Sequence, residues 1–478
     1  MSTTPLSLEA ALPYALTGVP SLPGLGRARS GKVRDAFDLA DGKMLLVTSD
    51  RVSAFDRVLG TIPYKGQVLN QLAAWWFQRT RHILPNHLLA VPDANCMVVR
   101  RARPLPVEVV VRGFLTGVTS TSLWTMYSQG VQRPYGIDLP AGMKKNDRLP
   151  TPVITPTTKA AAGQHDAPLT SEDVVNQGLV DAALWRRVTT AALALFAEGQ
   201  AVAERAGLLL VDTKYELGLV DGPEGEELVL IDEVHTPDSS RYWTKSGWEA
   251  GRAEPLDKER LRIALADEGY KGDGPPPPLS DAIRVGLAAT YLELFERLTG
   301  APLVPAEQPA GERIERMITT PIVPILMGSR SDLEHARSIV TALDAFGIAG
   351  EIRVASAHKS PGYLLEMLAA YESDPRPKVY LTVAGRSNAL SGMVCAAVTA
   401  PVVSVPPYSD RFGGADVFSS LRMPSGVAPA LVMDPDNAAL FCAKVLGLGR
   451  VELQDRVARL HHAHRGKLMH DDAELRRR

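Results

Sequence analysis

A regular alternation of strand-like and helix-like segments after residue 321 constrains the fold most strongly. The strand-like segments are VPILM, EIRVA, KVYLTVA and PVVSV, and the segments between them are SDLEHARSIVTALDAF, PGYLLEMLAAYE and LSGMVCAAVTA. Such alternation is typical of βαβ units, in which helices cover both faces of a parallel sheet. We therefore predict an α/β three-layer domain with a parallel, flavodoxin-like sheet over residues 321–450.

Residues 1–300 show a different pattern. VEVVVRGFL, LLLVDTKYELGLV and ELVLIDEVHT read as strands, the last two joined as a hairpin across DGPEGE, and a long helical pattern ends at Gly207. We predict an α+β domain with mostly antiparallel sheets. Residues 301–320, rich in Pro and Ala, are expected to be a linker, and residues 451–478 a charged helix or tail.

Composition narrows the class of partner. The 478-residue chain is long enough for two to four domains, and its net charge of -2 gives no bulk attraction to nucleic acid or anionic membranes. Small molecules are the expected partners. Cys96, Cys395 and Cys442 are too far apart for a disulfide framework or a zinc site, and no apolar run could span a bilayer, so we expect a cytoplasmic protein.

Polar loops follow three consecutive predicted strands of the C-terminal domain: GSRSD, SAHKSP and GRSNALSG. Because ligands bind beyond the carboxyl ends of strands in open α/β sheets, the three loops should converge on one site. In the first loop we expect Gly328 to allow a close turn, and Ser329, Ser331 and Asp332 to face an anion at a helix start. The alternative is that Ser331 or Asp332 only caps the helix.

The second loop carries His358 between Ser356 and Lys359. A histidine can give or take a proton near neutral pH, and a neighbouring cation favours its neutral form. We predict a catalytic His358, against the alternative of a structural histidine. Lys359 could bind a phosphate or carboxylate, or be solvated.

The motifs MGSRSD, SAHKSP, AGRSNALSGMV and DVFSSLRMPSG resemble the aminoimidazole ribonucleotide (AIR) carboxylase family of purine biosynthesis, over about residues 321–450. The resemblance implies that the first loop binds the ribonucleotide, that His358 moves a proton at the carboxylated carbon, and that the third loop holds the carboxylate or CO2. The implied substrate-binding residues are Gly328, Ser329, Ser331, Asp332, Ser356, Lys359, Gly385, Arg386, Ser387 and Asn388.

Two departures bear on the reaction. Lys359 replaces the arginine of the SAHR sequence common in the bacterial mutase branch, and AGRSNALSGM lacks that branch's loop histidine. Both features resemble the animal-type branch, which implies direct carboxylation with CO2 and no ATP, metal or biotin. A mutase acting on the N5-carboxylated ribonucleotide remains the alternative.

In the N-terminal domain, DTKYELG places Asp212, Lys214 and Glu216 at alternate positions, so a strand would project all three from one face. IDEVHTPDSSRYW follows with Asp232, Asp238 and further charges. Carboxylates gathered with basic groups suit Mg2+ held by one or two carboxylates and substrate phosphates. The alternative is a solvated hairpin.

GKVRD, TSDRVSAFD, VEVVVRGFLTG, TPTTKAAAGQHDAPLT, DTKYELG and DEVHTPDSSRYW resemble the phosphoribosylaminoimidazole-succinocarboxamide (SAICAR) synthetase family over about residues 25–300. The resemblance implies that ATP and Mg2+ activate a ribonucleotide carboxylate, which the amine of L-aspartate converts into an amide. The implied roles are ATP binding by Lys32, Arg34 and Glu108; metal binding by Glu216 and Asp232; catalysis by Asp212 and Lys214; and substrate binding by Arg112, Ser120, Lys159, Asp166, Asp238, Ser239 and Arg241. Val118 stands where the family has a serine, and Ser120 is the expected substitute.

Together the two resemblances imply a bifunctional enzyme of purine biosynthesis whose C-terminal product is the N-terminal substrate. They also imply a homo-oligomer, an octamer built on the C-terminal domain. A rival hypothesis keeps the synthetase and makes the C-terminal domain a non-catalytic oligomerisation or ligand-sensing module.

Overall fold

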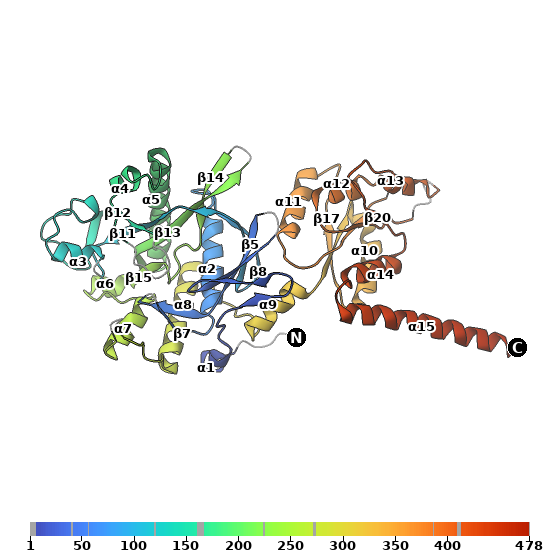
Figure 1. The fold of residues 1–478 in the computed structure, drawn as a ribbon, viewed down its shortest axis with the longest axis horizontal. Helices are drawn as coiled ribbons and strands as arrows, with labels where there is room; N and C mark the ends of the chain where they lie inside the picture. The colour runs from blue at the N-terminus through green and yellow to red at the C-terminus, as the bar shows by residue number, and fades with distance from the viewer. Residues whose placement is uncertain are drawn as a thin grey trace. The chain divides into compact units, whose positions relative to one another are not determined.

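The computed structural model describes residues 6–39, 42–55, 57–118, 121–159, 167–222, 225–270, 274–385, 387–408 and 413–477. The chain divides into two compact units, Met1–Ile314 and Glu315–Arg478 (Figure 1). The division falls in the segment expected to be a linker, which contains helix α9 (Ala310–Thr319). Among the described helices, none has both the length and the apolar character needed to cross a bilayer.

The first unit contains two large antiparallel sheets, as the sequence predicted, and two short two-stranded sheets. The five-stranded sheet has the order β3 (Arg29–Ser30), β4 (Arg34–Asp38), β5 (Lys43–Thr48), β9 (Cys96–Arg100) and β8 (Leu88–Asp93). The six-stranded sheet contains β10 (Arg103–Pro104), β11 (Val107–Phe114), β12 (Arg148–Thr158), β13 (Leu208–Gly222), β14 (Gly225–Ile231) and β15 (Ser240–Thr244). Its long strand β13 pairs with β10, β11, β14 and β15, so β13 organises this sheet.

Three helices pack against these sheets: α2 (Lys65–Thr80), α5 (Ala182–Arg205) and α8 (Asp281–Thr299). Helix α5 begins where the Asp181 carboxylate accepts hydrogen bonds from two backbone amides, and it ends before Gly207, which has a φ of 70°. This end confirms the predicted helix stop. Large side chains such as Trp76, Phe196 and Tyr291 are fully buried in one continuous core that these elements share.

The second unit has a five-stranded parallel sheet, which confirms the predicted α/β architecture. Its order is β17 (Ala349–Val354), β16 (Ile322–Met327), β18 (Tyr380–Val383), β19 (Val402–Ser404) and β20 (Ala430–Leu431). Successive side chains of β16 face opposite sides. Val323 and Ile325 pack with α10 (Leu333–Asp344) and α14 (Pro435–Leu446), whereas Ile322 and Leu326 pack with α11 (Pro361–Glu372) and α12 (Ala389–Ala397).

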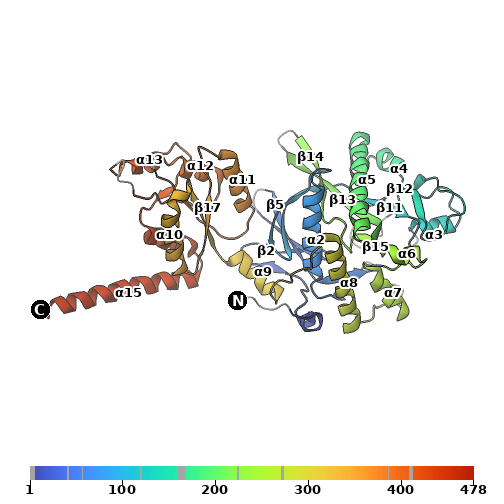
Figure 2. The ribbon, with the colours of Figure 1, turned by 180° about the vertical axis from the view of Figure 1, so that it is seen from behind.

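The last helix, α15 (Val451–Leu475), extends away from the C-terminal sheet in both views (Figures 1 and 2). Its first turns pack on the sheet's core through Leu453, Val457 and Leu460. Beyond them the side chains of His461, His462 and His464 are exposed.

Candidate active sites

A cavity of about 550 Å³ lies in the first unit. It is lined by Gly31, Lys32, Val33, Arg34, Ser53, Ala54, Phe55, Lys159, Lys214, Glu216, Asp232, Glu233, Asp238, Ser239, Lys258 and Arg262. These residues come from both sheets, from the loop after β14 and from the start of α7 (Glu259–Asp267). Twelve of these side chains are charged or carry a hydroxyl group, so the cavity suits a strongly charged ligand.

Strand β13 contributes side chains to the cavity from one face and to the core from the other. Thr213, Tyr215 and Leu217 are each at most 1% exposed, whereas Lys214 and Glu216 face the cavity. This arrangement confirms the predicted alternation and contradicts the solvated hairpin, because the opposite face of the strand is core.

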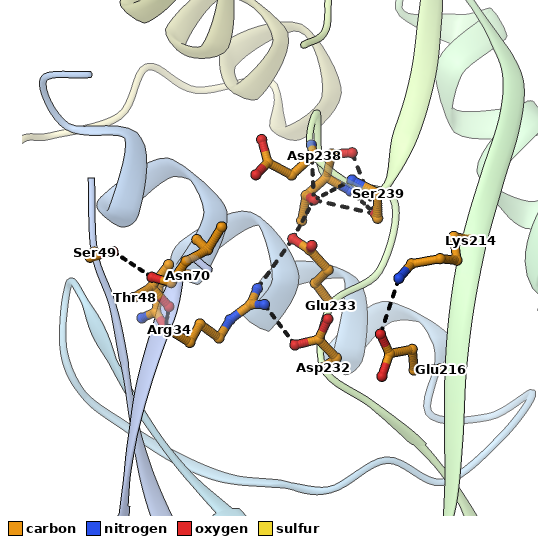
Figure 3. Close-up of polar contacts among 12 residues, drawn as sticks. Arg34, Thr48, Ser49, Asn70, Lys214, Glu216, Asp232, Glu233, Asp238 and Ser239 are labelled. Carbon is orange, nitrogen blue, oxygen red and sulfur yellow. Dashed lines mark hydrogen bonds and ion pairs between the residues drawn. The ribbon is translucent and has the colours of Figure 1, made fainter. Parts of the chain in front are cut away.

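Glu216 lies between two lysines. Its carboxylate is 3.2 Å from the Lys214 Nζ (Figure 3). It is also 2.5 Å from the Lys159 Nζ. Burial favours the neutral acid, but Lys214 and Lys159 outweigh burial and lower the pKa of Glu216. Lys214 also donates to Glu108 at 2.6 Å. Glu108 therefore holds Lys214 and is not among the residues that line the cavity.

Arg34 joins the two sheets across this cavity. Its guanidinium is 2.6 Å from Asp232 and 3.1 Å from Glu233, just after β14 (Figure 3). Asp232 has a φ of 63°, a left-handed conformation uncommon for a residue other than glycine. Burial raises the pKa of Asp232 to about 6, and repulsion from Glu216 and Glu233 opposes the stabilising effect of Arg34.

Glu216 and Asp232 both line the cavity and repel each other, and a cation bound near both would relieve that repulsion. In the described part of the chain, no group of three or more His, Cys, Asp or Glu side chains could hold a metal by itself. Mg2+ is commonly held by one or two carboxylates with water and substrate phosphates. The pair Glu216 and Asp232 therefore fits the expected metal when a phosphate ligand supplies the other oxygens.

Farther along the same face of β13, Asp212 lies between two arginines. Its carboxylate is 3.4 Å from Arg112 and 3.3 Å from Arg241, and Arg112 also donates to Thr155 at 2.9 Å. Burial and Asp212 have opposing effects on both guanidinium groups: the pKa of Arg112 is lowered and that of Arg241 is raised. Asp212 orients two anion-binding side chains in this arrangement.

In the second unit, the carboxyl ends of β17, β16 and β18 lie side by side. Met327 pairs with Val354 on one side and Val383 on the other. The three polar loops therefore start from adjacent strand ends, as predicted. Exposed side chains there include Ser329, Ser331, His358 and Lys359.

Hydrogen bonds within the loops give each an internal order. The Ser331 hydroxyl donates to Ser329 at 3.0 Å and to Asp332 at 3.2 Å. The Lys359 amide donates to the Ser356 hydroxyl at 3.2 Å. His358 projects from the turn that this bond closes and is open to a ligand or to solvent.

The family model described as SAICAR synthetase matches residues 27–277, more than half of the chain. The chain belongs to the SAICAR synthetase family. The family model described as AIR carboxylase matches residues 322–467. A SAICAR synthetase domain and an AIR carboxylase-type domain are thus fused in one polypeptide.

Two relatives illustrate the match to the SAICAR synthetase domain. The phosphoribosylaminoimidazole-succinocarboxamide synthase of Legionella pneumophila (strain Lens) is 47% identical over 300 residues, 61% of this chain and 93% of its own length. The SAICAR synthase of Saccharomyces cerevisiae, solved in complex with SAICAR, has a TM-score of 0.53 and 29% identity, covering 60% of this chain and 99% of that one.

The AIR carboxylase-type domain has its own relative. Treponema denticola PurE is 49% identical, covering 32% of this chain and 98% of that one, with a TM-score of 0.32.

Two expectations about the AIR carboxylase-type domain need revision. Gly328 does not have a positive φ, and an added Cβ would lie 3.7 Å from its nearest neighbour, so nothing in the turn demands glycine. The side chain of Asn388 is buried: it donates to Ser420 at 2.5 Å and accepts from the Ser391 amide at 3.2 Å, at the start of α12. Asn388 therefore orders the third loop from behind.

The remaining expected residues divide between described and undescribed parts. Ser120, Asp166 and Arg386 lie outside the described residues. Gly385 and Ser387 lie in the third loop, where the Ser387 amide donates to the Gly385 carbonyl at 2.8 Å. Val118 is 67% exposed, so its side chain fills no pocket in the SAICAR synthetase domain.

Sequence reasoning missed Lys65, Lys258 and Arg262 near the first cavity. Lys258 and Arg262 both line it. The sequence DKERLR contains a usable signal, because a lysine and an arginine four positions apart share one face of a helical turn. Lys65 carries no such signal, because its partner Asp238 is 173 residues away.

Proposed function

We propose that the N-terminal domain condenses a carboxylated aminoimidazole ribonucleotide with L-aspartate, using ATP, to give SAICAR. The arrangement that carries the proposal is the cavity that Glu216 and Asp232 line together with lysines and arginines. Transfer of a phosphoryl group depends mainly on positioning and on neutralisation of charge, which such a cavity provides.

The chain's own side chains have separate tasks in this proposal. Lys32 and Lys214 bind phosphate oxygens, and Glu216 and Asp232 would hold Mg2+, which supplies charge neutralisation when it is bound. Arg34 keeps Asp232 in place through the 2.6 Å contact. Arg112 and Arg241, oriented by Asp212, bind the anionic groups of the ribonucleotide. Lys159 and Ser239 complete the substrate side, and Asp238 contributes through Lys258, which it contacts at 3.6 Å; Ser120 and Asp166 are further candidates.

The reaction balances without another reagent. A carboxylate oxygen of the ribonucleotide attacks the terminal phosphorus of ATP, and ADP leaves. The amine of aspartate then attacks the activated carbonyl, phosphate departs, and the amine proton passes to solvent or phosphate. Lys214 lies beside Glu108 and Glu216, which raise its pKa against the effect of burial, so it acts as a permanent cation and not as a base.

For the C-terminal domain we propose carboxylation of aminoimidazole ribonucleotide with CO2. His358 accepts the proton that leaves the carbon as the new carbon–carbon bond forms. Ser329, Ser331, Asp332, Ser356, Lys359, Gly385, Arg386 and Ser387 bind the ribonucleotide and the carboxylate. The adjacent strand ends support one shared site for these loops.

One experiment tests both activities. The full chain is incubated with aminoimidazole ribonucleotide, bicarbonate, ATP, Mg2+ and aspartate, and each component is left out in turn. The proposal expects carboxylation without ATP and SAICAR only with all components. If the carboxylated product forms from the N5-carboxylated ribonucleotide but not from bicarbonate, the C-terminal domain is a mutase. If it forms from neither, the C-terminal domain is non-catalytic.

We also propose a homo-oligomer, and an octamer specifically, built on the C-terminal domain. Exposed apolar side chains near the third loop support self-association, with Tyr408 73%, Phe418 59% and Leu421 58% exposed. Light scattering coupled to gel filtration of the full chain tests the state: a monomer would contradict the proposal.

A further inference from the structure

Lys65, the first residue of α2, is fully buried in the SAICAR synthetase domain. Its Nζ is 2.8 Å from the Asp238 Oδ2, and the exposed fractions of the two side chains are 0% and 3%. Burial lowers the pKa of Lys65, and the contact with Asp238 opposes that effect. A charged lysine is almost never fully buried unless it is paired, so this position requires an explanation.

The carboxylate of Asp238 is occupied on both oxygens. The Tyr291 hydroxyl donates to Oδ1 at 2.6 Å, and Oδ2 faces both Lys65 and, at 3.6 Å, the Nζ of Lys258. Asp238 therefore has little capacity left for a substrate. Its remaining effect on the cavity is exerted through Lys258, whose side chain is 16% exposed.

Lys258 is held from the backbone side as well. Its amide donates to the Pro237 carbonyl at 3.2 Å, next to Asp238, and Asp257 accepts from the Tyr242 amide at 2.7 Å and the Glu259 amide at 2.6 Å. The ammonium group is thus directed to the cavity wall that it shares with Arg262. Lys258 and Arg262, which also contacts Glu259 at 2.6 Å, place two cations on one wall, where an anionic oxygen group can bind.

Stability alone is a weak reason for the buried pair. Taking two charges out of water costs about as much as their attraction returns, and apolar replacements of buried pairs are often neutral or stabilising. A pair whose second member also contacts a cavity-lining lysine is better explained by orientation of that lysine.

We propose that Lys65 is a positioning residue: acting through Asp238, it holds Lys258 in place to bind a carboxylate or phosphate of an anionic substrate. The inference rests on the proposed synthetase reaction and extends it to a residue outside the cavity. Lys65 itself touches no substrate.

The test compares two variants. Lys65→Met keeps a side chain of similar length but removes the charge, whereas Lys65→Arg keeps a cation. KM and kcat are measured for aspartate, the carboxylated ribonucleotide and ATP. We expect Lys65→Met to raise the KM for one of these by about 10-fold or more and to leave at least one other unchanged. Lys65→Arg should recover part of the loss. The substrate whose KM rises is the one that Lys258 binds.

Leu294→Ala is the matched control, because Leu294 is fully buried one turn from Tyr291 in α8 and has no polar partner in the site. It should lower the melting temperature without changing any KM. If Lys65→Met behaves in the same way, with lower stability and unchanged KM values, Lys65 is only structural and the inference is wrong.

A second variant covers the case in which Lys65→Met does not fold. Tyr291→Phe removes one hydrogen bond to Asp238 and leaves all charges in place, so it should raise the same KM by a smaller factor. An unchanged KM overturns the inference. Failure of the proposed function can be told apart from failure of this inference, because the wild-type chain would then give no SAICAR. In that case, ligand-induced shifts in melting temperature are compared for wild type and Lys65→Met. They decide whether Lys65 supports anion binding.

Discussion

The Arg34 guanidinium lies 2.6 Å from the Asp232 carboxylate and thereby connects β4 of one sheet with the loop after β14 of the other. The contact fixes one proposed metal ligand relative to the second, Glu216 on β13. Arg34 was expected to bind nucleotide phosphates directly; in the structure it also contacts Glu233, so its main visible task is to hold this loop.

Replacement of Asp232 should therefore affect the requirement for Mg2+. We expect Asp232→Asn to raise the Mg2+ concentration for half-maximal SAICAR synthesis by about 10-fold or more, because one of two protein carboxylates is lost. Glu226→Gln is the control, because it also removes one negative charge but does so on an exposed part of β14. Identical Mg2+ titrations for the two variants would rule out Asp232 as a ligand.

Replacement of His358 should separate the two activities. We expect His358→Asn to slow carboxylation by about 100-fold or more, the range for loss of a general acid or base, while SAICAR synthesis from supplied carboxylated substrate stays unchanged. His461→Asn, on the exposed face of α15, should have no effect on either. Carboxylation that persists in His358→Asn would favour a different proton acceptor.

Stability of the N-terminal unit should depend on pH through Asp257. Burial raises the pKa of this carboxyl to about 7, from an ordinary value near 3.8. Between these two pKa values the folded form holds a proton that the unfolded form releases. The contribution of Asp257 to the free energy of unfolding is therefore complete below about pH 4 and is lost as the pH rises through 7. Each unit of difference corresponds to about 1.4 kcal/mol.

We expect the unfolding free energy of the wild type to fall more between pH 5 and 8 than that of Asp257→Asn. All six tryptophans lie between residues 75 and 248, so their fluorescence during urea unfolding reports on this unit alone. The same pH dependence in both proteins would show that Asp257 titrates normally.

Gly199 in α5 packs so closely against the loop after β14 that there is no room for a larger side chain. A Cβ at Gly199 would lie 2.5 Å from the His235 ring and 2.6 Å from Leu210. Gly199→Ala should destabilise the N-terminal unit by about 1–3 kcal/mol through overpacking. Gly286→Ala in α8, where nothing lies within 4 Å, should be neutral or stabilising by up to about 1 kcal/mol. Urea midpoints compare the two; equal midpoints would mean that His235 moves freely.

Patterns with short periods were readable from the sequence. The strand–helix alternation after residue 321 and the two faces of β13 each depend on neighbouring residues, and both were confirmed. Loops after parallel strands could also be grouped, because topology brings their starting points together.

Contacts between distant residues were not readable. Lys65 and Asp238, or Arg34 and Asp232, meet only because two sheets pack around a common core. Side-chain direction was equally hidden: Asn388 follows two loop residues and looks like part of the ligand-binding edge, yet it points inward to Ser404 and Ser420.

The alternation along β13 sets a rule for tolerated change. One extra residue between Asp212 and Tyr215 would turn every following side chain of β13 to the opposite face of the sheet. Glu216 would then point into the apolar core and Tyr215 into the cavity. Two extra residues would preserve the parity. Natural or engineered length variants in this strand should therefore survive only in even steps.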